Sequence, residues 1–311
     1  MQRTLRHPGF WLSCGLTAIG VFFQYLILIP LELVGMALNR MRTSGEDQLH
    51  LSSDPLALGI ANILAFGAAI AIGVMINRVP FRTVLPQRKL PLLAWVAIPL
   101  LAVGAGIVLS EFDNCIRWVL PPPQWMVDIV GSLFLSKDRL FSLLFTLVVV
   151  APVTEELLFR GVILRGLLGR FSTKWALVIS AGLFAVMHQN PWQAGPAFFL
   201  GLLFGWYYLR TQSLWPCIAG HALNNLLSFV VMQGAFGLWE PLTVEDYSKV
   251  EFMPWWVTAL GLATLAGGLG LFRWATAASA TDWDAPRPPR NPGQPLPPVL
   301  PSPAPEHQPN G

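Results

Sequence analysis

The residues of this sequence whose types and spacing could do chemistry are ionisable side chains inside apolar segments. Glu155 and Glu156 are adjacent within the run TEELLFR at residues 154–160, and His188 and His221 lie in two later apolar segments. Carboxylate and imidazole groups transfer protons near neutral pH, as the base of a hydrolytic reaction or as a relay. Polar groups inside a bilayer are costly, so each one marks a candidate functional site.

The two adjacent carboxylates are predicted to have different roles. Glu156 and Arg160 are separated by four residues, so on a helix they face each other in the order that favours an ion pair. We therefore expect this pair to have a structural role. Glu155 points about 100° away around the same helix and is left without that partner.

The histidines add two further polar groups at a similar depth. His221 and Asn225 are four residues apart and share one helix face. At about 1.5 Å of rise per residue, Glu155, His188, His221 and Asn225 each lie roughly 14 to 22 Å from the nearest basic or polar end of their segment. These four side chains are therefore expected to meet near the middle of the bilayer.

The composition indicates that the elements positioning these residues are membrane helices. The chain has 311 residues, of which 54% are hydrophobic and 12% are charged, whereas soluble domains carry roughly 25% charged residues. The net charge of +3 is too small for a nucleic-acid-binding surface. Its three cysteines are too far apart to indicate a disulfide framework.

Apolar runs of about 20 residues can cross a bilayer as helices. The sequence predicts an all-α, polytopic membrane bundle of about eight transmembrane helices, with the fifth unusually short. The predicted spans are 10–38, 55–76, 90–109, 140–158, 175–188, 194–209, 214–232 and 254–272. A G-x-x-x-G pattern at Gly201 and Gly205 predicts close packing of the sixth span against a neighbour.

The distribution of basic residues predicts the orientation, because basic loops stay in the cytoplasm. Lys and Arg residues alternate with acidic loops in a pattern that places both termini in the cytoplasm, with Arg40 and Arg42 as exceptions. We expect an integral, multi-pass protein of the cell (inner) membrane. The basic residues used are Arg3, Arg6, Arg78, Arg82, Arg88, Lys89, Arg165, Arg170, Lys174, Arg210 and Arg273, and the acidic ones are Glu46, Asp47, Glu111, Asp113, Glu240, Glu245, Asp246 and Glu251.

The chain is predicted to divide into four regions. Residues 1–139 hold three spans and a Pro- and Trp-containing segment from 111 that lies along the outer interface or forms a plain loop. Residues 140–232 form the catalytic core with four spans. Residues 233–275 contain a loop and the last span, and 276–311 form a Pro-rich, disordered cytoplasmic tail.

At these positions the sequence resembles the CAAX-processing and bacteriocin-processing (CPBP) family of intramembrane proteases, which includes the prenyl-protein endopeptidases. The family signatures are E-E-x-x-x-R, F-x-x-x-H and H-x-x-x-N on separate membrane helices. The chain matches them in order, with Glu155, Glu156 and Arg160, then Phe184 and His188, then His221 and Asn225. The resemblance covers residues 152–228.

The resemblance implies a helical bundle with an intramembrane catalytic cavity and hydrolysis of a peptide bond near a membrane anchor. We assign Glu155 to activate a water molecule, because a buried carboxylate is a better base near neutral pH. His188 would hold that water or share its proton. His221 and Asn225 would donate to the oxyanion. Glu156, Arg160 and Phe184 would orient these groups.

Participation of a metal is left open by the sequence. Glu155, His188 and His221 could supply three zinc ligands. No H-E-x-x-H motif places two ligands on one helix, a metal would occupy the candidate base, and a metal-free mechanism accounts better for Asn225. We therefore favour the mechanism without a metal and assign no certain cofactor.

Two other functional classes remain possible from the residues alone. A proton-coupled transporter would use the same carboxylates and histidines as a relay, although the sequence contains no internal repeat. A catalytically silent scaffold or immunity protein could keep the same fold. The expected partners of the protease are the lipid bilayer and a membrane-anchored peptide or protein, with no nucleic acid. The sequence specifies neither the substrate nor the oligomeric state.

Overall fold

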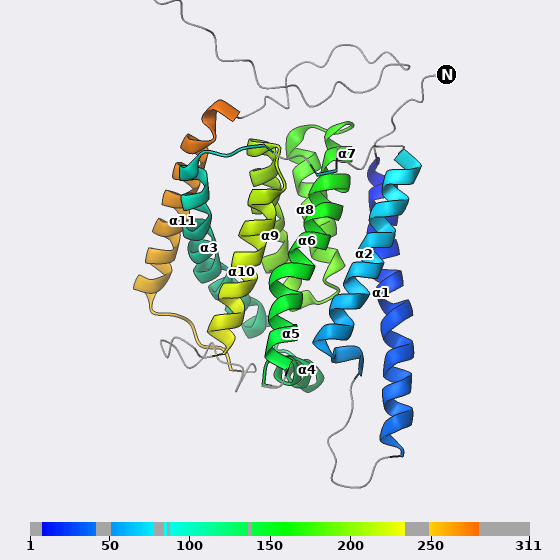
Figure 1. Cartoon of the computed structure of the whole chain (residues 1–311). Helices are drawn as coiled ribbons and strands as arrows, with labels where there is room; N and C mark the ends of the chain where they lie inside the picture. Colours follow the sequence, from blue (N-terminus) through cyan, green and yellow to red (C-terminus); the bar gives the residue numbers. More distant parts are fainter. Residues whose placement is uncertain are drawn as a thin grey trace, which may run out of the picture.

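The computed structural model describes residues 8–41, 51–77, 84–85, 88–135, 139–233 and 249–279 (Figure 1). These described residues form helices and connecting turns without a strand, which confirms the predicted all-α fold. In chain order the elements are α1 (Phe10–Asn39), η1 (Leu51–Ser53), α2 (Pro55–Asn77), α3 (Leu92–Val119), α4 (Gln124–Leu135), α5 (Leu140–Phe145), η4 (Thr146–Val150), α6 (Ala151–Glu156), η5 (Leu157–Leu164), α7 (Arg165–Leu168), α8 (Thr173–Met187), α9 (Pro191–Thr211), α10 (Trp215–Met232), α11 (Trp255–Ala275) and η8 (Ala277–Ser279).

Several of these helices have the length and composition of membrane spans, so the protein is an integral, multi-pass membrane protein. In the described residues, five helical stretches meet both requirements, namely α1, α2, α3, the continuous stretch from α5 to α7, and α11. The α8 helix is apolar but shorter. Helices also occur at the sixth and seventh predicted spans, as α9 and α10. The count of eight crossings stays a prediction.

The predicted end of the third span is wrong. Helix α3 continues past residue 109 to Val119 because its last turns are polar but still hydrogen-bonded. The Arg117 Nε donates to Asp113 Oδ2 at 2.8 Å, one turn away. The segment 111–139 is therefore not a plain loop, since it contains the end of α3 and the short helix α4, and its position at the outer interface stays a prediction. Figure 1 shows α4 at the end of the bundle, turned away from the direction of the long helices.

The predicted end of the fourth span is also wrong, because one helical stretch continues from Leu140 to Leu168. It contains two π-helical segments, η4 and η5, on either side of α6. In η4 the Ala151 N–H donates to the carbonyl of Thr146, five residues earlier. The next residue, Pro152, has no N–H to donate. Such π-helical insertions often occur at functional sites, and here they flank the two adjacent glutamates.

The helices pack around this central stretch. Figure 1 shows α1 beside α2 at one side of the bundle and α3 beside α11 at the other, and both pairs are in contact. One continuous cluster of buried apolar residues includes Leu16 of α1, Phe66 of α2, Phe159 of η5 and Phe272 of α11. The candidate catalytic helices therefore share one hydrophobic core with the helices that flank them.

Small residues allow the closest helix contacts, as the G-x-x-x-G pattern predicted. A Cβ atom on Gly201 would lie 3.0 Å from the Cα of Ala181, so α9 approaches α8 more closely than a larger residue would allow. The predicted close packing of this pattern is confirmed. Its consequence for the site is that the backbone of α9 comes within reach of polar side chains on η5.

Figure 1 shows the start of α1, the segment α7 and the end of α11 at the same end of the bundle, and α4 at the opposite end. This arrangement agrees with an even number of crossings.

Several residues used to predict orientation, and the Pro-rich tail, lie outside the described residues. These are Arg3, Arg6, Arg42, Glu46, Asp47, Arg78, Arg82, Glu240, Glu245, Asp246 and the chain from 280 to 311.

Candidate active site

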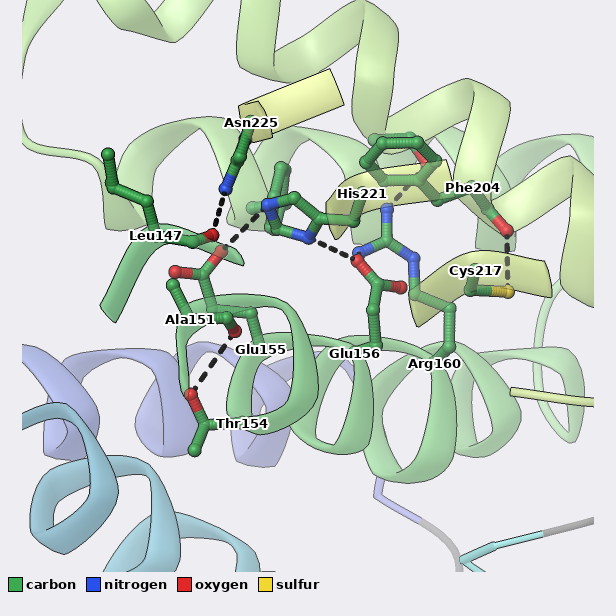
Figure 2. Close-up of polar contacts among 12 residues, drawn as sticks. Leu147, Ala151, Thr154, Glu155, Glu156, Arg160, Phe204, Cys217, His221 and Asn225 are labelled. Atoms are coloured by element: carbon green, nitrogen blue, oxygen red, sulfur yellow. Dashed lines mark hydrogen bonds and ion pairs between the residues drawn. The ribbon is translucent and has the colours of Figure 1, made fainter. Parts of the chain in front are cut away.

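Three helical segments bring the predicted site residues into one region of the bundle. Glu155 and Glu156 end α6, His188 follows the last residue of α8, and His221 lies in α10. Figure 2 shows the His221 ring between the two glutamate side chains, with Asn225 farther along α10. The structure therefore places these residues, predicted from distant parts of the sequence, on facing helices.

Arg160 and Glu156 form the predicted ion pair. The Arg160 Nη1 donates to Glu156 Oε1 at 2.9 Å, and the two side chains are 1% and 0% exposed. The Arg160 Nη2 donates to the carbonyl of Gly201 at 2.9 Å, which the close approach of α9 makes possible. The guanidinium carbon also lies 4.7 Å from the centre of the Phe184 ring and 5.5 Å from that of Phe204. The ion pair is confirmed, and it connects η5 to α8 and α9.

His221 contacts both carboxylates, through different ring nitrogens. Its Nδ1 lies 3.0 Å from Glu156 Oε1, a hydrogen-bond distance, and its Nε2 lies 3.9 Å from Glu155 Oε2. The ring stacks on Phe204 with centres 5.1 Å apart and planes at 20°. An ionised carboxylate only accepts hydrogen bonds, so Glu156 selects the ring with a proton on Nδ1. This contact between Glu156 and His221 was not predicted from the sequence.

Glu155 differs from its neighbour in that its contact with His221 is longer. Its side chain is 13% exposed, and its Oε2 atom is buried without a hydrogen-bond partner among the described residues. The separation of 3.9 Å from His221 Nε2 is too long for a direct hydrogen bond. Glu155 is thus a partly buried carboxylate whose contact with His221 is longer than a hydrogen bond, whereas Glu156 Oε1 binds both Arg160 and His221.

His188 lies at the end of α8, where the chain turns toward α9. Its Nδ1 is 2.9 Å from the carbonyl of Phe184. Because a carbonyl accepts, Nδ1 carries a proton in this contact, and Nε2 is then an acceptor in the neutral ring. The Phe184 ring contacts both histidines edge-on, at 4.9 Å from His188 and 5.8 Å from His221. The described contacts therefore connect His188 to His221 through Phe184, and His221 in turn contacts the two glutamates.

Asn225 is bound to the backbone of the π-helical segment. Its Nδ2 donates to the carbonyl of Leu147 at 2.8 Å, as Figure 2 shows. The sequence indicated the shared face with His221 but not this contact. A side-chain amide has two N–H donors, so one of them is still available for another acceptor.

The possible metal ligands of the described residues are not grouped around one point. Among the described residues, no three His, Cys, Asp or Glu side chains are grouped as metal ligands. The zinc set considered from the sequence was Glu155, His188 and His221. In the structure both histidines use Nδ1, His188 with the carbonyl of Phe184 and His221 with Glu156, so Nε2 is the ring nitrogen left as a possible ligand atom in each. We therefore derive no step through a metal.

Comparisons with known proteins find similarity over the part of the chain that contains the candidate site residues. Residues 137–227 match the family model "Type II CAAX prenyl endopeptidase Rce1-like". The matched segment contains every predicted site residue, from Glu155 to Asn225. A Bacillus subtilis protein named "Putative membrane peptidase YdiL" is 25% identical over 225 residues, which is 70% of this chain and 86% of that protein. No solved structure matches the chain.

The helical membrane fold and these similarities support the class of membrane proteases for this protein. The resemblance to the CPBP family, first indicated by the three motifs, is confirmed by both comparisons.

Proposed function

We propose that the protein is an intramembrane endopeptidase that hydrolyses a peptide bond of a membrane-anchored protein or peptide. The observation that carries this proposal is the contrast between two adjacent carboxylates. Glu156 Oε1 binds Arg160 Nη1 at 2.9 Å and His221 Nδ1 at 3.0 Å, whereas Glu155 Oε2 lies 3.9 Å from His221 Nε2 and, like Glu156 Oε2, has no hydrogen-bond partner among the described residues. A general base must be close to its target and free to accept a proton, and Glu155 meets the second requirement.

In this mechanism Glu155 takes a proton from a water molecule as the water oxygen attacks the carbonyl carbon of the scissile bond. The proton is then delivered to the leaving amide nitrogen as the C–N bond breaks, so that the base is regenerated. His188 Nε2 can accept a hydrogen bond from the same water, since Nδ1 donates to Phe184. The two groups would orient the nucleophile from different helices.

The oxyanion of the tetrahedral intermediate needs hydrogen-bond donors. His221 Nε2 can donate only when the ring carries both protons, because Nδ1 already donates to Glu156. Asn225 can donate through the N–H that is not bound to Leu147. These two residues lie one helical turn apart on α10, which suits joint stabilisation of one oxygen atom.

The residues outside the site support an orientation with both termini in the cytoplasm. Three basic residues lie close together in sequence here: Arg165 in α7, Arg170 just after it and Lys174 in the first turn of α8. The segment α7 is at the end of the bundle where α1 starts and α11 ends (Figure 1). Glu111 lies toward the C-terminal end of α3, and Glu251 lies just before the start of α11. Both of these helix ends are at the end of the bundle away from α7 (Figure 1). Under the positive-inside rule the α7 end faces the cytoplasm.

The test is cleavage of membrane proteins in cells that carry the wild-type chain or the variants Glu155→Gln and His188→Ala. We expect each variant to lose about 100- to 10,000-fold in cleavage rate, the range for general acid–base groups, with normal folded yield. The matched control is Glu32→Gln in α1. Glu32 is another acid of a membrane helix, and it binds Ser52 Oγ at 2.7 Å away from the site. Full cleavage by Glu155→Gln would contradict the proposal.

A further inference from the structure

The π-helical segment before the glutamates leaves one backbone carbonyl without its helical donor. In an α-helix the carbonyl of Leu147 would accept from the N–H of Ala151, but this N–H donates to Thr146 instead. In a π-helix the donor would be residue 152, which is proline and has no N–H. A carbonyl without a partner inside a membrane bundle is destabilising.

A side chain from another helix supplies the missing donor. The Asn225 Nδ2 reaches across from α10 and donates to Leu147 O at 2.8 Å, across 78 positions of sequence. This bond determines the orientation of the Asn225 amide group. The second N–H of the amide is held at a fixed angle to the first, since both belong to one planar group. Anything that satisfies Leu147 differently would release the amide.

We infer that Pro152 is a positioning residue for the oxyanion donor Asn225. By withholding a backbone N–H, Pro152 leaves the carbonyl of Leu147 to Asn225, which orients the second amide N–H for the reaction. The inference rests on the proposed endopeptidase function for its catalytic consequence. The hydrogen-bond relation between Pro152 and Asn225 does not depend on that function.

The substitution Pro152→Ala adds one N–H donor next to η4. This donor can bond to Leu147 in the π-helical register, so the Asn225 amide loses its exclusive partner. We expect kcat to fall by about 10- to 100-fold with KM nearly unchanged, because an oxyanion donor acts in the transition state and its complete removal lowers kcat by about 100- to 1,000-fold. The melting temperature should stay the same or rise, since alanine replaces proline in a helix.

The control is Pro99→Ala, which removes a proline from the interior of α3. It should leave kcat at the wild-type value. The double variant Pro152→Ala with Asn225→Ala shows whether the two residues act together. We expect it to have the same kcat as Asn225→Ala alone, because residues in one pathway are not additive. A further loss in the double variant, or a wild-type kcat for Pro152→Ala, would overturn the inference.

Thermal unfolding in detergent tests the same relation without proteolysis. Asn225→Ala should lower the melting temperature in the wild-type background, because Leu147 O is left unpaired. The decrease should be smaller in the Pro152→Ala background, where a backbone donor is available. Equal decreases in both backgrounds would refute the inference even if Glu155 is the base. Coupled melting temperatures in a protein that cleaves no peptide would instead refute the proposed function alone.

Discussion

Arg160 is a buried cation whose partners come from several helices. Glu156 Oε1, the Gly201 carbonyl and the rings of Phe184 and Phe204 surround its guanidinium group. We predict that Arg160→Ala destabilises the bundle by about 3 to 5 kcal/mol, because it leaves the Glu156 carboxylate buried without its ion-pair partner. The free energy of unfolding in detergent measures this loss.

The control for Arg160→Ala is a substitution in a solvent-exposed salt bridge. Arg139 Nη1 lies 3.2 Å from Asp54 Oδ2, and the two side chains are 42% and 29% exposed. We expect Arg139→Ala to change the free energy of unfolding by about 1 kcal/mol or less, as surface ion pairs do. If both substitutions have the same effect, burial is not the reason for the importance of Arg160.

The grouping of the site residues also predicts how the enzyme responds to chelators. Glu155 is treated as the base, and no three possible metal ligands converge in the described part of the chain. Purified protein should therefore retain its cleavage rate after exhaustive chelation, with metal content checked by elemental analysis. Loss of activity that returns with added zinc would contradict the metal-free mechanism.

At the scale of helices, α3 and α11 make close contacts at glycines, and at Gly104 the neighbouring atoms belong to the backbone of α11. A Cβ atom on Gly104 would lie against the backbone nitrogen of Leu265, well inside van der Waals contact. Backbone atoms cannot turn away as side chains can, so we predict that Gly104→Ala separates the two helices. A lower melting temperature and faster proteolysis between α10 and α11 would report the separation.

Gly106 provides a matched control for Gly104 on the same helix. A Cβ atom there would meet nothing within 4 Å, so Gly106→Ala should leave the melting temperature unchanged or raise it slightly through helix propensity. An equal decrease for both variants would mean that α3 tolerates no alanine, whatever the contact with α11.

The sequence predicted the positions of the helices better than their ends. Apolar runs locate helices because lipid contact requires them, but they do not record where backbone hydrogen bonding stops. For this reason α3 extends past 109 and the central helix extends past 158. The π-helical segments were not predicted either, although Pro152, which has no N–H to donate, lies directly after the first of them in α6.

The same distinction holds for the site residues. Spacing along one helix predicted the pair of Glu156 and Arg160, because four residues bring two side chains to one face. The contacts of His221 with Glu156 and of Asn225 with Leu147 join different helices. They depend on how α10 is rotated against the central helix, which spacing within one segment cannot give.

For the whole molecule, the predicted orientation can be tested with a native cysteine. Cys115 is exposed near the C-terminal end of α3, whereas Cys217 is buried and Cys14 is partly buried. We predict that a membrane-impermeant thiol reagent labels Cys115 in spheroplasts. In a background with Cys115→Ser, a cysteine introduced as Lys174→Cys in the first turn of α8 should react with the reagent only after the membrane is opened. If Lys174→Cys is labelled in intact spheroplasts and Cys115 is labelled only after the membrane is opened, the topology is opposite to the predicted one.

The pair of Arg160 and Glu156 also has a consequence for how the protein enters the membrane. The chain is made from its N-terminus, so the helix carrying Arg160 is synthesised before Phe184, Gly201 and Phe204 exist. An arginine at the centre of an isolated helix raises its insertion free energy by about 2.5 to 3.5 kcal/mol.

Glu156, one turn earlier on the same helix, is present from the start and lies 2.9 Å from Arg160 in the folded protein. Arg160 and Glu156 can therefore enter the bilayer as a neutral pair, before any later helix is available to them. The counter-ion that accompanies Arg160 during biogenesis is the carboxylate that later binds His221. Glu156 is thus available to pair with Arg160 during insertion and also binds His221 in the folded protein.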